Sequence, residues 1–355
     1  MQMSSAAFIG VERSHGRVER LLAELMRPED EARFGGAWQK AQEQVRALAL
    51  RPAKRLRPRL LQLGFELVRA EPPPEALWRF AAGLELLHTF MLVHDDVADR
   101  SELRRGGPTL QRLLRAHGPG DELAVVAGDH LFARALELML STGLTAAPAA
   151  THYYLGICRH TAVGQYLDLS FSARPLHAVS TLEALRVADL KTAKYSFGAP
   201  LACGGLLAGA PAPFNAALER VGRFAGLAFQ LRDDLQGLFG DEALLGKPGS
   251  ADLTCAKRTL PMIAAYRRAS PAERELLERL GPRTSREGCA RAQEIIRARG
   301  GIAVTERAIA RTRSAALRAL EALAPPGPAL EALEAMICRL ADGPRPTRLP
   351  EAASG

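Results

Sequence analysis

The sequence predicts an all-α fold, and three observations support this prediction. Apolar residues recur three and four positions apart over many turns, the spacing of one helix face, in the segments 74–99, 121–140 and 212–241. Alternating strand-like runs and Asn-Gly hairpin signals are scarce. Proline and glycine clusters separate the helical stretches, so we expect many antiparallel helices.

The composition indicates a sizeable core under a mixed, moderately basic surface. Apolar residues make up 47% of the 355 residues, and 47 basic residues are opposed by 39 acidic ones, a formal net charge of +8. This surplus favours anionic ligands in general. No long Lys/Arg block and no aromatic–basic interleaving is present, so no nucleic-acid partner is expected. We expect one domain over residues 1–355, poorly ordered at 1–10 and 343–355.

The cysteines and the apolar runs indicate a reducing compartment. The five cysteines are far apart and form no CxxC pair, which favours free thiols over a disulfide framework or a zinc site. The first 20 residues lack the apolar core of a signal peptide. The longest uncharged stretch, 195–218, contains three prolines and four glycines, so it predicts a broken buried helix. We therefore expect a cytoplasmic protein without a transmembrane segment.

The helical segment 74–99 ends in three acids within five residues. On a helix, Asp95 and Asp99 share a face and Asp96 lies one step around. Bare carboxylates at this spacing repel one another, and an apolar surrounding screens the repulsion poorly. A cation would balance them, and hard oxygen ligands suit Mg²⁺, which keeps several waters and shares its site with substrate phosphates. The alternative is an ordinary solvated helix end.

Two arginines follow these acids at once. Arg104 and Arg105 stand beside a Gly-Pro turn. Arginine forks bind phosphate oxygens in a bidentate manner. Acids that suit a metal, next to bases that suit phosphate, predict a polyphosphate ligand between them.

A second acidic pair, Asp233 and Asp234, lies in the helical segment 212–241. The position four residues after Asp233 is Gly237 rather than a third acid, and Asp241 lies roughly 12 Å along an ideal helix, too far to chelate the same ion easily. Two acidic helices that face each other would form a cleft that holds a diphosphate through bridging magnesium ions. An acid substituted at Gly237 is then expected to alter the metal dependence only modestly.

Further basic residues occur in three clusters. Each one alone would be an ordinary surface charge, but together they are the counter-charges that two diphosphate groups need. They are Lys54, Arg55 and Arg57, then Lys191 beside Thr192, then Lys247, Lys257 and Arg258. His88 lies two helical turns before Asp95 on the same face, so its position fits a place near the ligand. The alternative is a histidine in the core or behind the ligand-binding residues.

Taken in order, these segments resemble the trans-isoprenyl diphosphate synthases of the polyprenyl synthetase family. The matching segments are KRLRP (54–58), LLHTFMLVHDDVADRSELRRGGPT (86–109), GD (128–129), GQYLDL (164–169), KTA (191–193), FQLRDD (229–234), and GKPGSADL with KRT (246–259). The DDxxD pattern alone is weakly specific, but the ordered set is very specific. The resemblance implies an all-α multi-helix bundle around a deep central cavity, usually a homodimer, that condenses isopentenyl diphosphate with an allylic diphosphate.

The resemblance also implies a role for each matching residue. Up to three Mg²⁺ ions would be bound by Asp95, Asp96, Asp99 and Asp233. The allylic diphosphate would be contacted by Arg104, Lys191, Lys247 and Lys257. Isopentenyl diphosphate would be held by Lys54, Arg57, His88 and Arg105. The developing allylic cation would lie beside Thr192 and Gln230. Gly237 is a departure, because many relatives carry an acid there.

The length of the product is expected to depend on Phe90, which lies five residues before Asp95, roughly 7.5 Å down an ideal helix. A ring there blocks chain growth, and Met91 beside it is a more flexible, weaker stop. With no insertion in the first acidic motif, this pattern resembles enzymes that make C20 geranylgeranyl diphosphate, and C15 farnesyl diphosphate stays open. The alternative for Phe90 is ordinary core packing.

Two other functions fit part of the pattern. A class I terpene cyclase also ionises allylic diphosphates at a DDxxD motif, but it needs no site for isopentenyl diphosphate, and Lys54, Arg57, His88 and Arg105 argue against it. A non-catalytic subunit of a heteromeric synthase typically loses acidic motif residues, whereas the first motif here is whole.

Overall fold

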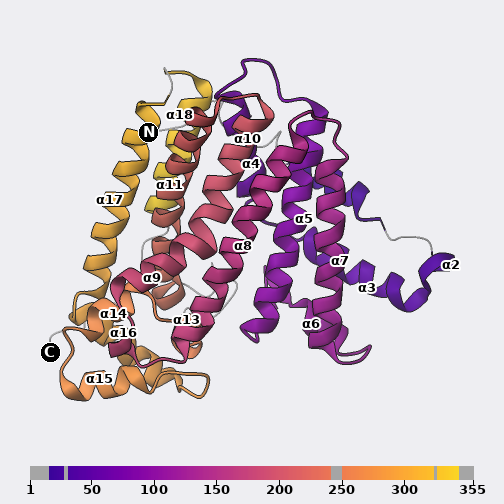
Figure 1. Ribbon diagram of the computed structural model, residues 1–355. Coiled ribbons are helices and arrows are strands. Elements are labelled where there is room, and N and C mark those ends of the chain that lie inside the picture. The colour runs from indigo at the N-terminus through magenta and orange to yellow at the C-terminus, as the bar shows by residue number, and fades with distance from the viewer. Residues whose placement is uncertain (1–15, 28–30, 241–249, 324–325, 344–355) are drawn as a thin grey trace. The chain divides into compact units, whose positions relative to one another are not determined.

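The computed structural model describes residues 16–27, 31–240, 250–323 and 326–343 (Figure 1). It confirms the all-α prediction, because the regular secondary structure of the described residues is helical except for one short hairpin of two antiparallel strands, β1 (Leu103–Arg104) and β2 (Gly107–Pro108). The chain ends that were expected to be poorly ordered lie outside the described residues, apart from Gly343.

The helices follow the predicted periodicity. The segments 74–99, 121–140 and 212–241 correspond to α5, α7 and α11. The α-helices are α2 (Glu31–Phe34), α3 (Gly36–Ala49), α4 (Leu56–Glu66), α5 (Glu75–Ala98), α6 (Leu110–Leu114), α7 (Gly120–Leu140), α8 (Ala147–Ser172), α9 (Thr181–Val187), α10 (Ala199–Leu207), α11 (Ala212–Phe239), α13 (Ala251–Thr254), α14 (Leu260–Tyr266), α15 (Pro271–Glu278), α16 (Arg286–Ala298), α17 (Gly301–Glu321) and α18 (Pro328–Asp342). A 3₁₀ turn, η1 (Leu176–Ala178), and a π-helix, η2 (Ala188–Gly198), complete the set, and residues 16–25 are also helical.

The chain divides into two compact units, each assembled from separate stretches of sequence. Unit 1 contains residues 1–157, 196–219 and 323–333, and unit 2 contains residues 158–195, 220–322 and 334–355. Because α8, α11 and α18 each contribute residues to both units, the division does not follow the order of the chain. The expectation of one domain over residues 1–355 stays a prediction.

Unit 1 is organised around α5, which packs against α7 and α4, while α4 packs against α10. The crossing of α4 and α10 is tight. A Cβ on Gly64 would lie 2.0 Å from the carbonyl oxygen of Leu201, and a Cβ on Gly204 would lie 2.1 Å from that of Leu61. Glycine at both positions therefore lets the two helix backbones touch.

The apolar character of α5 comes from its place in the core of unit 1. By length and composition alone α5 could cross a membrane, but 67% of its most apolar window is buried inside the protein. Leu77, Phe80, Leu84 and Leu87 have no exposed surface. Burying such a side chain contributes roughly 1.5–3 kcal/mol to stability. Core packing thus accounts for the apolar run that leads into the first acidic motif.

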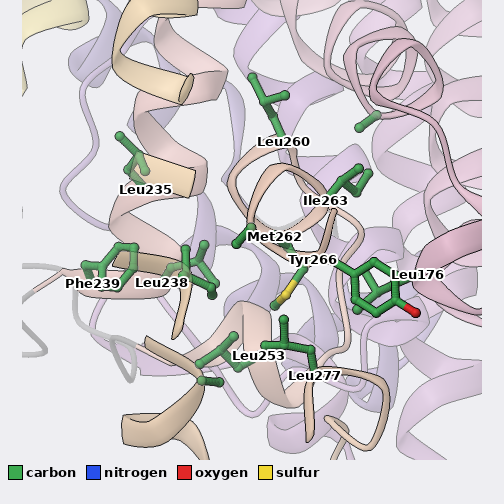
Figure 2. Packing of buried hydrophobic residues seen from close by; sticks show 14 of the residues in the cluster. Leu176, Leu235, Leu238, Phe239, Leu253, Leu260, Met262, Ile263, Tyr266 and Leu277 are labelled. Atoms are coloured by element: carbon green, nitrogen blue, oxygen red, sulfur yellow. The ribbon is translucent and has the colours of Figure 1, made fainter. Parts of the chain in front are cut away.

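The core of unit 2 surrounds α14, all seven residues of which are buried. α14 packs against α9, α16 and α17. Figure 2 shows Met262 and Ile263 of α14 with Leu238 of α11 and Leu253 of α13. This core fixes the end of α11 and the short helix α13, which carry the second acidic pair and a further buried acid.

Candidate active site

The three acids of the first motif lie in the last turn of α5 and directly after it. Asp99 ends the helix, and its backbone N–H donates to the carbonyl oxygen of Asp95 at 2.8 Å. Asp95 and Asp99 are half-buried, whereas Asp96 is fully buried. Carboxylates at a helix C-terminus lie at the negative end of the helix dipole and are unfavourable there. The end of α5 therefore needs balancing positive charge.

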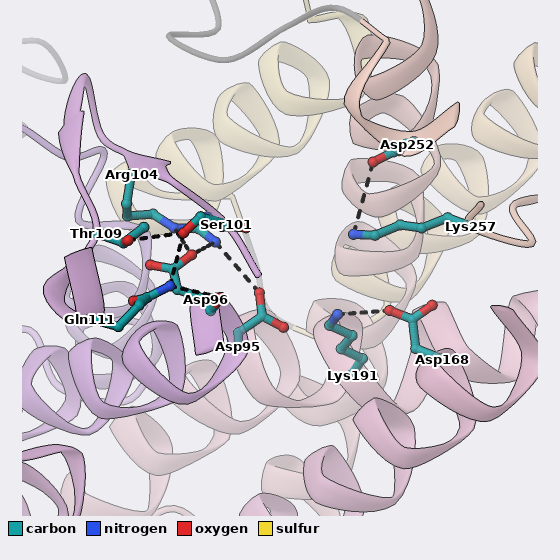
Figure 3. A network of polar contacts seen from close by, with 10 residues as sticks. All are labelled: Asp95, Asp96, Ser101, Arg104, Thr109, Gln111, Asp168, Lys191, Asp252 and Lys257. Carbon is teal, nitrogen blue, oxygen red and sulfur yellow. Dashed lines mark hydrogen bonds and ion pairs between the residues drawn. The ribbon is translucent and has the colours of Figure 1, made fainter. Parts of the chain in front are cut away.

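Arg104 supplies part of that charge (Figure 3). Its Nε and Nη2 donate to Asp96 Oδ1 at 2.9 and 2.5 Å, and Nη2 lies 3.6 Å from Asp95 Oδ2. Burial raises the pKa of Asp96, and its hydrogen bonds with Arg104 oppose the rise. Burial lowers the pKa of Arg104, but the hydrogen bond and charge of Asp96 and the charges of Asp95 and Asp99 outweigh it, so this pKa is raised. One guanidinium thus contacts two of the carboxyl groups and is attracted by the charge of the third, and carboxylate oxygens are ligands that Mg²⁺ accepts together with water and phosphate oxygens.

The β1–β2 hairpin holds the backbone of Arg104. Its turn residues, Arg105 and Gly106, have φ angles of 51° and 74°, the left-handed region that a tight turn uses and that a non-glycine residue enters at a cost. Arg51 Nη1 donates to the carbonyl oxygens of Arg104 and Pro108, both at 2.8 Å. These bonds fix the direction in which the Arg104 side chain leaves the hairpin.

A second set of bonds anchors the segment between α5 and the hairpin. Gln111 Nε2 donates to the carbonyl oxygens of Asp96 at 3.0 Å and Ser101 at 2.8 Å, and Thr109 Oγ1 donates to Ser101 at 2.9 Å. Gln111 and Thr109 are buried. These roles could not be predicted from the sequence, because bonds to backbone oxygens eight to fifteen residues away leave no pattern of side chains.

Three of the predicted ligands of isopentenyl diphosphate form a basic cluster in unit 1. Burial lowers the pKa of His88 well below its ordinary value, and the charges of Arg57 and Arg105 lower it further. Burial also lowers the pKa of Arg105 to about 10, partly opposed by Glu85. Nη1 of Arg105 is buried without a hydrogen-bond partner among the described residues. The cluster thus combines a neutral histidine with two guanidinium groups, so it has more hydrogen-bond donors and positive charge than acceptors. Such a cluster suits an anion.

The other two residues of the first basic segment behave differently. Lys54 is exposed. Arg55 is buried and forms ion pairs with two acids. Its Nη1 donates to Glu85 at 2.8 Å, and its Nε donates to Glu19 at 2.7 Å. Its φ of 43° marks the left-handed residue directly before α4. Arg55 therefore holds the start of α4 in place.

Phe90 lies in an aromatic cluster between α5 and α7. Its ring centroid is 4.6 Å from that of His94 and 5.2 Å from that of Phe132. His94 Nε2 lies 3.1 Å from the carbonyl oxygen of Val125, and a Cβ on Gly128 would lie 2.5 Å from the same nitrogen. Phe90 and Met91 are half-buried. Phe132 therefore backs the ring that is expected to limit chain length.

In unit 2, Lys191 lies on the π-helix η2 and pairs with α8. Its Nζ donates to Asp168 Oδ2 at 2.8 Å (Figure 3). A Cβ on Gly164 would lie 2.5 Å from the backbone nitrogen of Lys191, so the backbones of α8 and η2 are in contact there. Thr192, the next residue, is half-buried. Sequence reasoning assigned nothing to Asp168, although it belongs to the matched segment 164–169.

The second acidic pair lies on α11. Asp233 is half-buried and Asp234 is buried. Burial raises the pKa of Asp234 to about 8, and the nearby acids Asp252 and Asp233 raise it further, while a hydrogen bond from Gln230 Nε2 at 2.8 Å opposes them. Asp234 is therefore the enclosed member of the pair, and Asp233 is its more accessible carboxylate.

Asp252 on α13 occupies the space beside Gly237. A Cβ on Gly237 would lie 2.1 Å from Asp252 Oδ2 and 2.6 Å from its Cγ. Asp252 is buried, and Lys257 Nζ lies 3.9 Å from its Oδ1 (Figure 3). The volume that a third acid at position 237 would need is thus filled by the carboxylate of Asp252. In the sequence, the only indication of a role for Asp252 is that it lies within the matched segment 246–259.

Some expectations about the site are not tested by this structure. Lys247 and Asp241 lie outside the described residues. Asp95 belongs to unit 1 and Asp233 to unit 2, and the expectation that their helices face each other stays a prediction. Within the described ranges, no group of three His, Cys, Asp or Glu side chains can hold a metal ion. An ion here would depend on substrate oxygens and water for part of its ligand set, as Mg²⁺ commonly does.

Comparison with known proteins shows which family the sequence matches. Residues 39–297 match the family described as Polyprenyl synthetase. The chain is 37% identical over 225 residues to a short chain isoprenyl diphosphate synthase of Methanothermobacter thermautotrophicus, and 36% identical over 253 residues to a (2E,6E)-farnesyl diphosphate synthase of Mycobacterium bovis. It is also 37% identical over 264 residues to a geranylgeranyl diphosphate synthase of Mycobacterium tuberculosis. These alignments cover 63%, 70% and 73% of this chain and 66%, 68% and 72% of those proteins, about two thirds of the relatives' length.

Solved structures resemble the chain over nearly its whole length. A geranylgeranyl pyrophosphate synthase from Corynebacterium glutamicum, complexed with isoprenyl diphosphate and magnesium, is 31% identical with a TM-score of 0.85, covering 93% of this chain and 98% of that one. A polyprenyl synthase from Caulobacter crescentus, complexed with calcium and isoprenyl diphosphate, is 31% identical with a TM-score of 0.83, covering 96% and 97%. The chain therefore has the all-α fold of these synthases.

Proposed function

Because the chain belongs to the polyprenyl synthetase family of prenyltransferases, we propose that it condenses isopentenyl diphosphate with allylic diphosphates in a Mg²⁺-dependent reaction. The proposed product is a short all-trans prenyl diphosphate, with C20 geranylgeranyl diphosphate as the end point. The observation that carries the proposal is the end of α5, where three carboxyl groups and Arg104 lie together. This combination suits a metal-bound diphosphate and has little other use in a buried helix end.

Divalent ions are proposed to bind at both acidic motifs. The donors are Asp95, Asp96 and Asp99 in unit 1 and Asp233 in unit 2, with up to three Mg²⁺ ions in all. When bound, these ions supply positive charge to the diphosphate as it leaves. Asp96 is fully buried, and its Oδ1 accepts two hydrogen bonds from Arg104, so in addition to its proposed part in metal binding it orients Arg104. We propose that Asp252 completes the second motif, because it fills the space beside Gly237.

The basic residues divide between the two substrates. For the allylic diphosphate, we assign Arg104, Lys191, Lys247 and Lys257. For isopentenyl diphosphate, we assign Lys54, Arg57, His88 and Arg105. The charges of Arg57 and Arg105 lower the pKa of His88, and the charge of Arg57 lowers the pKa of Arg105; a bound anion would relieve this repulsion, which supports the second assignment. Neutral His88 can donate a hydrogen bond without adding charge.

The chemistry follows from where charge develops. The allylic C–O bond breaks, and the diphosphate leaves with the bonding electrons. The double bond of isopentenyl diphosphate attacks the allylic carbon C1, a C4–C1 bond forms, and a proton is lost to the departed diphosphate. Arginine and lysine donors aimed at the diphosphate stabilise it more as its charge grows than they do in the ground state. Thr192 and Gln230 are proposed to lie beside the cation, and apolar walls must exclude water from it.

The end point of C20 rests on Phe90, whose ring is backed by Phe132 and His94. Relatives of similar identity carry the names of farnesyl and geranylgeranyl diphosphate synthases alike, so C15 is the competing product. We further propose that the chain acts as one synthase domain with a deep central cavity, in a cytoplasmic homodimer. The support for these points is the family, and light scattering of the purified protein would test the dimer.

The test is product analysis with labelled isopentenyl diphosphate and each of the C5, C10 and C15 allylic primers in turn. The proposal predicts incorporation of label with every primer and accumulation of C20 diphosphate. Release of diphosphate from the primer without incorporation would instead identify a class I terpene cyclase. No turnover by the purified protein, with activity restored by a partner chain, would identify a non-catalytic subunit.

A further inference from the structure

The turn between α13 and α14 carries Asp252 and Lys257, which we assign to the second acidic motif and to the allylic diphosphate, and its backbone is strained. Ala256 has a φ of 51°, in the left-handed region that a residue with a Cβ enters at a cost in free energy. The backbone N–H of Ala256 donates to the carbonyl oxygen of Leu253 at 3.1 Å, and that of Lys257 donates to Asp252 at 3.0 Å. A turn of this kind keeps its shape only where the surrounding residues hold it.

Arg258, the residue after Lys257, holds this turn. Its Nε and Nη2 both donate to the carbonyl oxygen of Arg174, at 3.0 and 2.7 Å, and its Nη1 donates to the carbonyl oxygen of Ala256 at 3.0 Å. Arg258 is half-buried, and burial lowers the pKa of its guanidinium, which the charge of Glu278 partly opposes. One guanidinium thus joins the strained residue to a backbone oxygen 84 residues away from Arg258 in the sequence.

The segment that contains Arg174 is itself fixed in place within unit 2. Arg174 Nη1 donates to Glu183 Oε1 at 3.0 Å, and Glu183 belongs to the capping box at the start of α9. The backbone N–H of Leu176 donates to both carboxylate oxygens of Glu278 at 2.9 Å, and η1, which begins at Leu176, packs against α14. The carbonyl oxygen of Arg174 is therefore a firm support, and the guanidinium of Arg258 ties the turn to it.

We propose that Arg258 is a positioning residue for Lys257, an inference that rests on the proposed function. Arg258 contacts neither substrate. It keeps Ala256 in the left-handed region and so fixes the direction in which the side chain of Lys257 leaves the turn. In the free protein, Lys257 Nζ lies 3.9 Å from Asp252 Oδ1. Because a lysine is a point charge on a flexible stem, the place of its backbone decides where that charge can lie. Without Arg258, the turn relaxes and carries Lys257 away from the diphosphate.

The substitution Arg258→Met tests this proposal, because methionine keeps an unbranched apolar stem and removes all three hydrogen bonds. The kcat/KM for the allylic primer should fall by about 10- to 100-fold, since a misplacement of about 1 Å can cost up to about 100-fold. The KM for isopentenyl diphosphate should stay nearly unchanged. Arg258→Lys, which keeps a donor for the Arg174 carbonyl oxygen, should lose less. An unchanged kcat/KM for the primer, or an equal effect on both substrates, would overturn the proposal.

Two combined variants show whether Arg258 acts through Lys257 and through the turn. Lys257→Met with Arg258→Met should lose no more kcat/KM than Lys257→Met alone, because no lysine is then left to position. Adding Ala256→Gly to Arg258→Met should recover part of the loss, because glycine adopts a φ of 51° without strain. Additive losses in the first combination would contradict the proposal, and so would an absence of recovery in the second.

Arg274→Met is the matched control at the other end of α14. Arg274 also holds a turn of unit 2 through backbone oxygens, since its Nε donates to the carbonyl oxygen of Tyr266 and its Nη2 to that of Arg267, both at 3.2 Å. Its substitution should leave the kinetic constants for both substrates unchanged, whatever its effect on the melting temperature. A fall in kcat/KM for the primer as large as that of Arg258→Met would show that general loosening of unit 2 explains the effect, and the proposal would be wrong.

A binding measurement keeps this inference distinct from the proposed function. An unreactive allylic thiolodiphosphate with Mg²⁺ should raise the melting temperature of the wild type and of Arg274→Met by the same amount, and that of Arg258→Met by less. If the wild type fails to elongate any primer, the proposed function is wrong, and this shift still decides whether Arg258 positions a ligand of an allylic diphosphate. Equal shifts for the wild type and Arg258→Met would overturn the proposal. If neither Arg258→Met nor Arg258→Lys folds, the residue is structural and the proposal is overturned as well.

Discussion

Gly237→Ala is the substitution for which the structure makes its most quantitative prediction. The new Cβ would lie 2.1 Å from Asp252 Oδ2, and ordinary contact begins at 3.4 Å, so the carboxylate has to move by at least 1.3 Å. Asp252 is buried, and crowding of this kind costs about 1–3 kcal/mol. Replacing a glycine inside a helix by alanine contributes about 1 kcal/mol in the opposite direction. We therefore expect stability to fall by about 1 kcal/mol.

A matched control isolates the collision with Asp252. Gly156 lies inside α8 with nothing within 4 Å of the position of its Cβ. Gly156→Ala should therefore raise stability by about 0.5–1 kcal/mol through helix propensity alone. The two variants should differ by about 1–3 kcal/mol in urea denaturation midpoints converted to free energies. In an Asp252→Ala background, Gly237→Ala should become stabilising as well.

The functional part of this prediction concerns the second acidic motif. Because Gly237→Ala displaces Asp252, the Mg²⁺ concentration for half-maximal activity should rise. Gly237→Asp should be more damaging, because it adds a second carboxylate to the same space, whereas the sequence alone predicts only a modest effect. The exchange Gly237→Asp with Asp252→Gly should recover part of the loss. If Gly237→Ala stabilises the protein as Gly156→Ala does and leaves the Mg²⁺ dependence unchanged, the reasoning about Asp252 is wrong.

Three further predictions concern other parts of the molecule. Asp95→Ala should abolish turnover of labelled isopentenyl diphosphate at saturating Mg²⁺, because it leaves diphosphate charge uncompensated; near-normal rates would remove Asp95 from the metal site. Phe90→Ala should lengthen the product beyond C20 and Phe132→Ala should do so to a smaller extent, as chromatography would show; an unchanged product spectrum would return both rings to ordinary core packing. Arg299 and the N-cap Ser270 lower the pKa of Glu273 to about 2, so its stabilising effect is complete above its ordinary pKa of 4.5 and is lost as the pH falls from 4.5 to about 2. Glu273→Gln should flatten the stability profile in that window, measured as urea midpoints at pH 5 and pH 3, and equal slopes for both proteins would contradict the assignment.

The fold class and the residue types of the site could be predicted because both leave short-range patterns. The spacing of the apolar residues in α5 and the spacing of Asp95, Asp96 and Asp99 are visible within a few turns of helix. Arg104 follows them within a few residues. The placement of Asp252 over Gly237 could not be predicted, because it joins residues on two different helices, α13 and α11. The pairing of Lys191 with Asp168 is likewise a contact between elements. The sequence also grouped Arg55 with Arg57, whereas burial against Glu85 and Glu19 gives Arg55 a structural role.

The structure separates Asp96 from the two other acids of its motif. A DDxxD pattern treats the three acids alike, but consecutive residues on a helix point about 100° apart. Asp96 therefore faces the hairpin and Arg104, whereas Asp95 and Asp99 stay half-buried on another side. The position of the hairpin, which Arg51 and the left-handed turn fix, determines which acid forms hydrogen bonds with Arg104.

The most direct measurement is a Mn²⁺ titration, followed by electron paramagnetic resonance, with an unreactive allylic thiolodiphosphate present and absent. The account predicts weak Mn²⁺ binding without the analogue and tight binding of more than one ion with it. It also predicts that Asp95→Asn and Asp233→Asn each weaken analogue binding, and that the double variant loses less than the sum of the two, because both acids act on one diphosphate. Equal Mn²⁺ affinity with and without the analogue, or strictly additive losses, would contradict it.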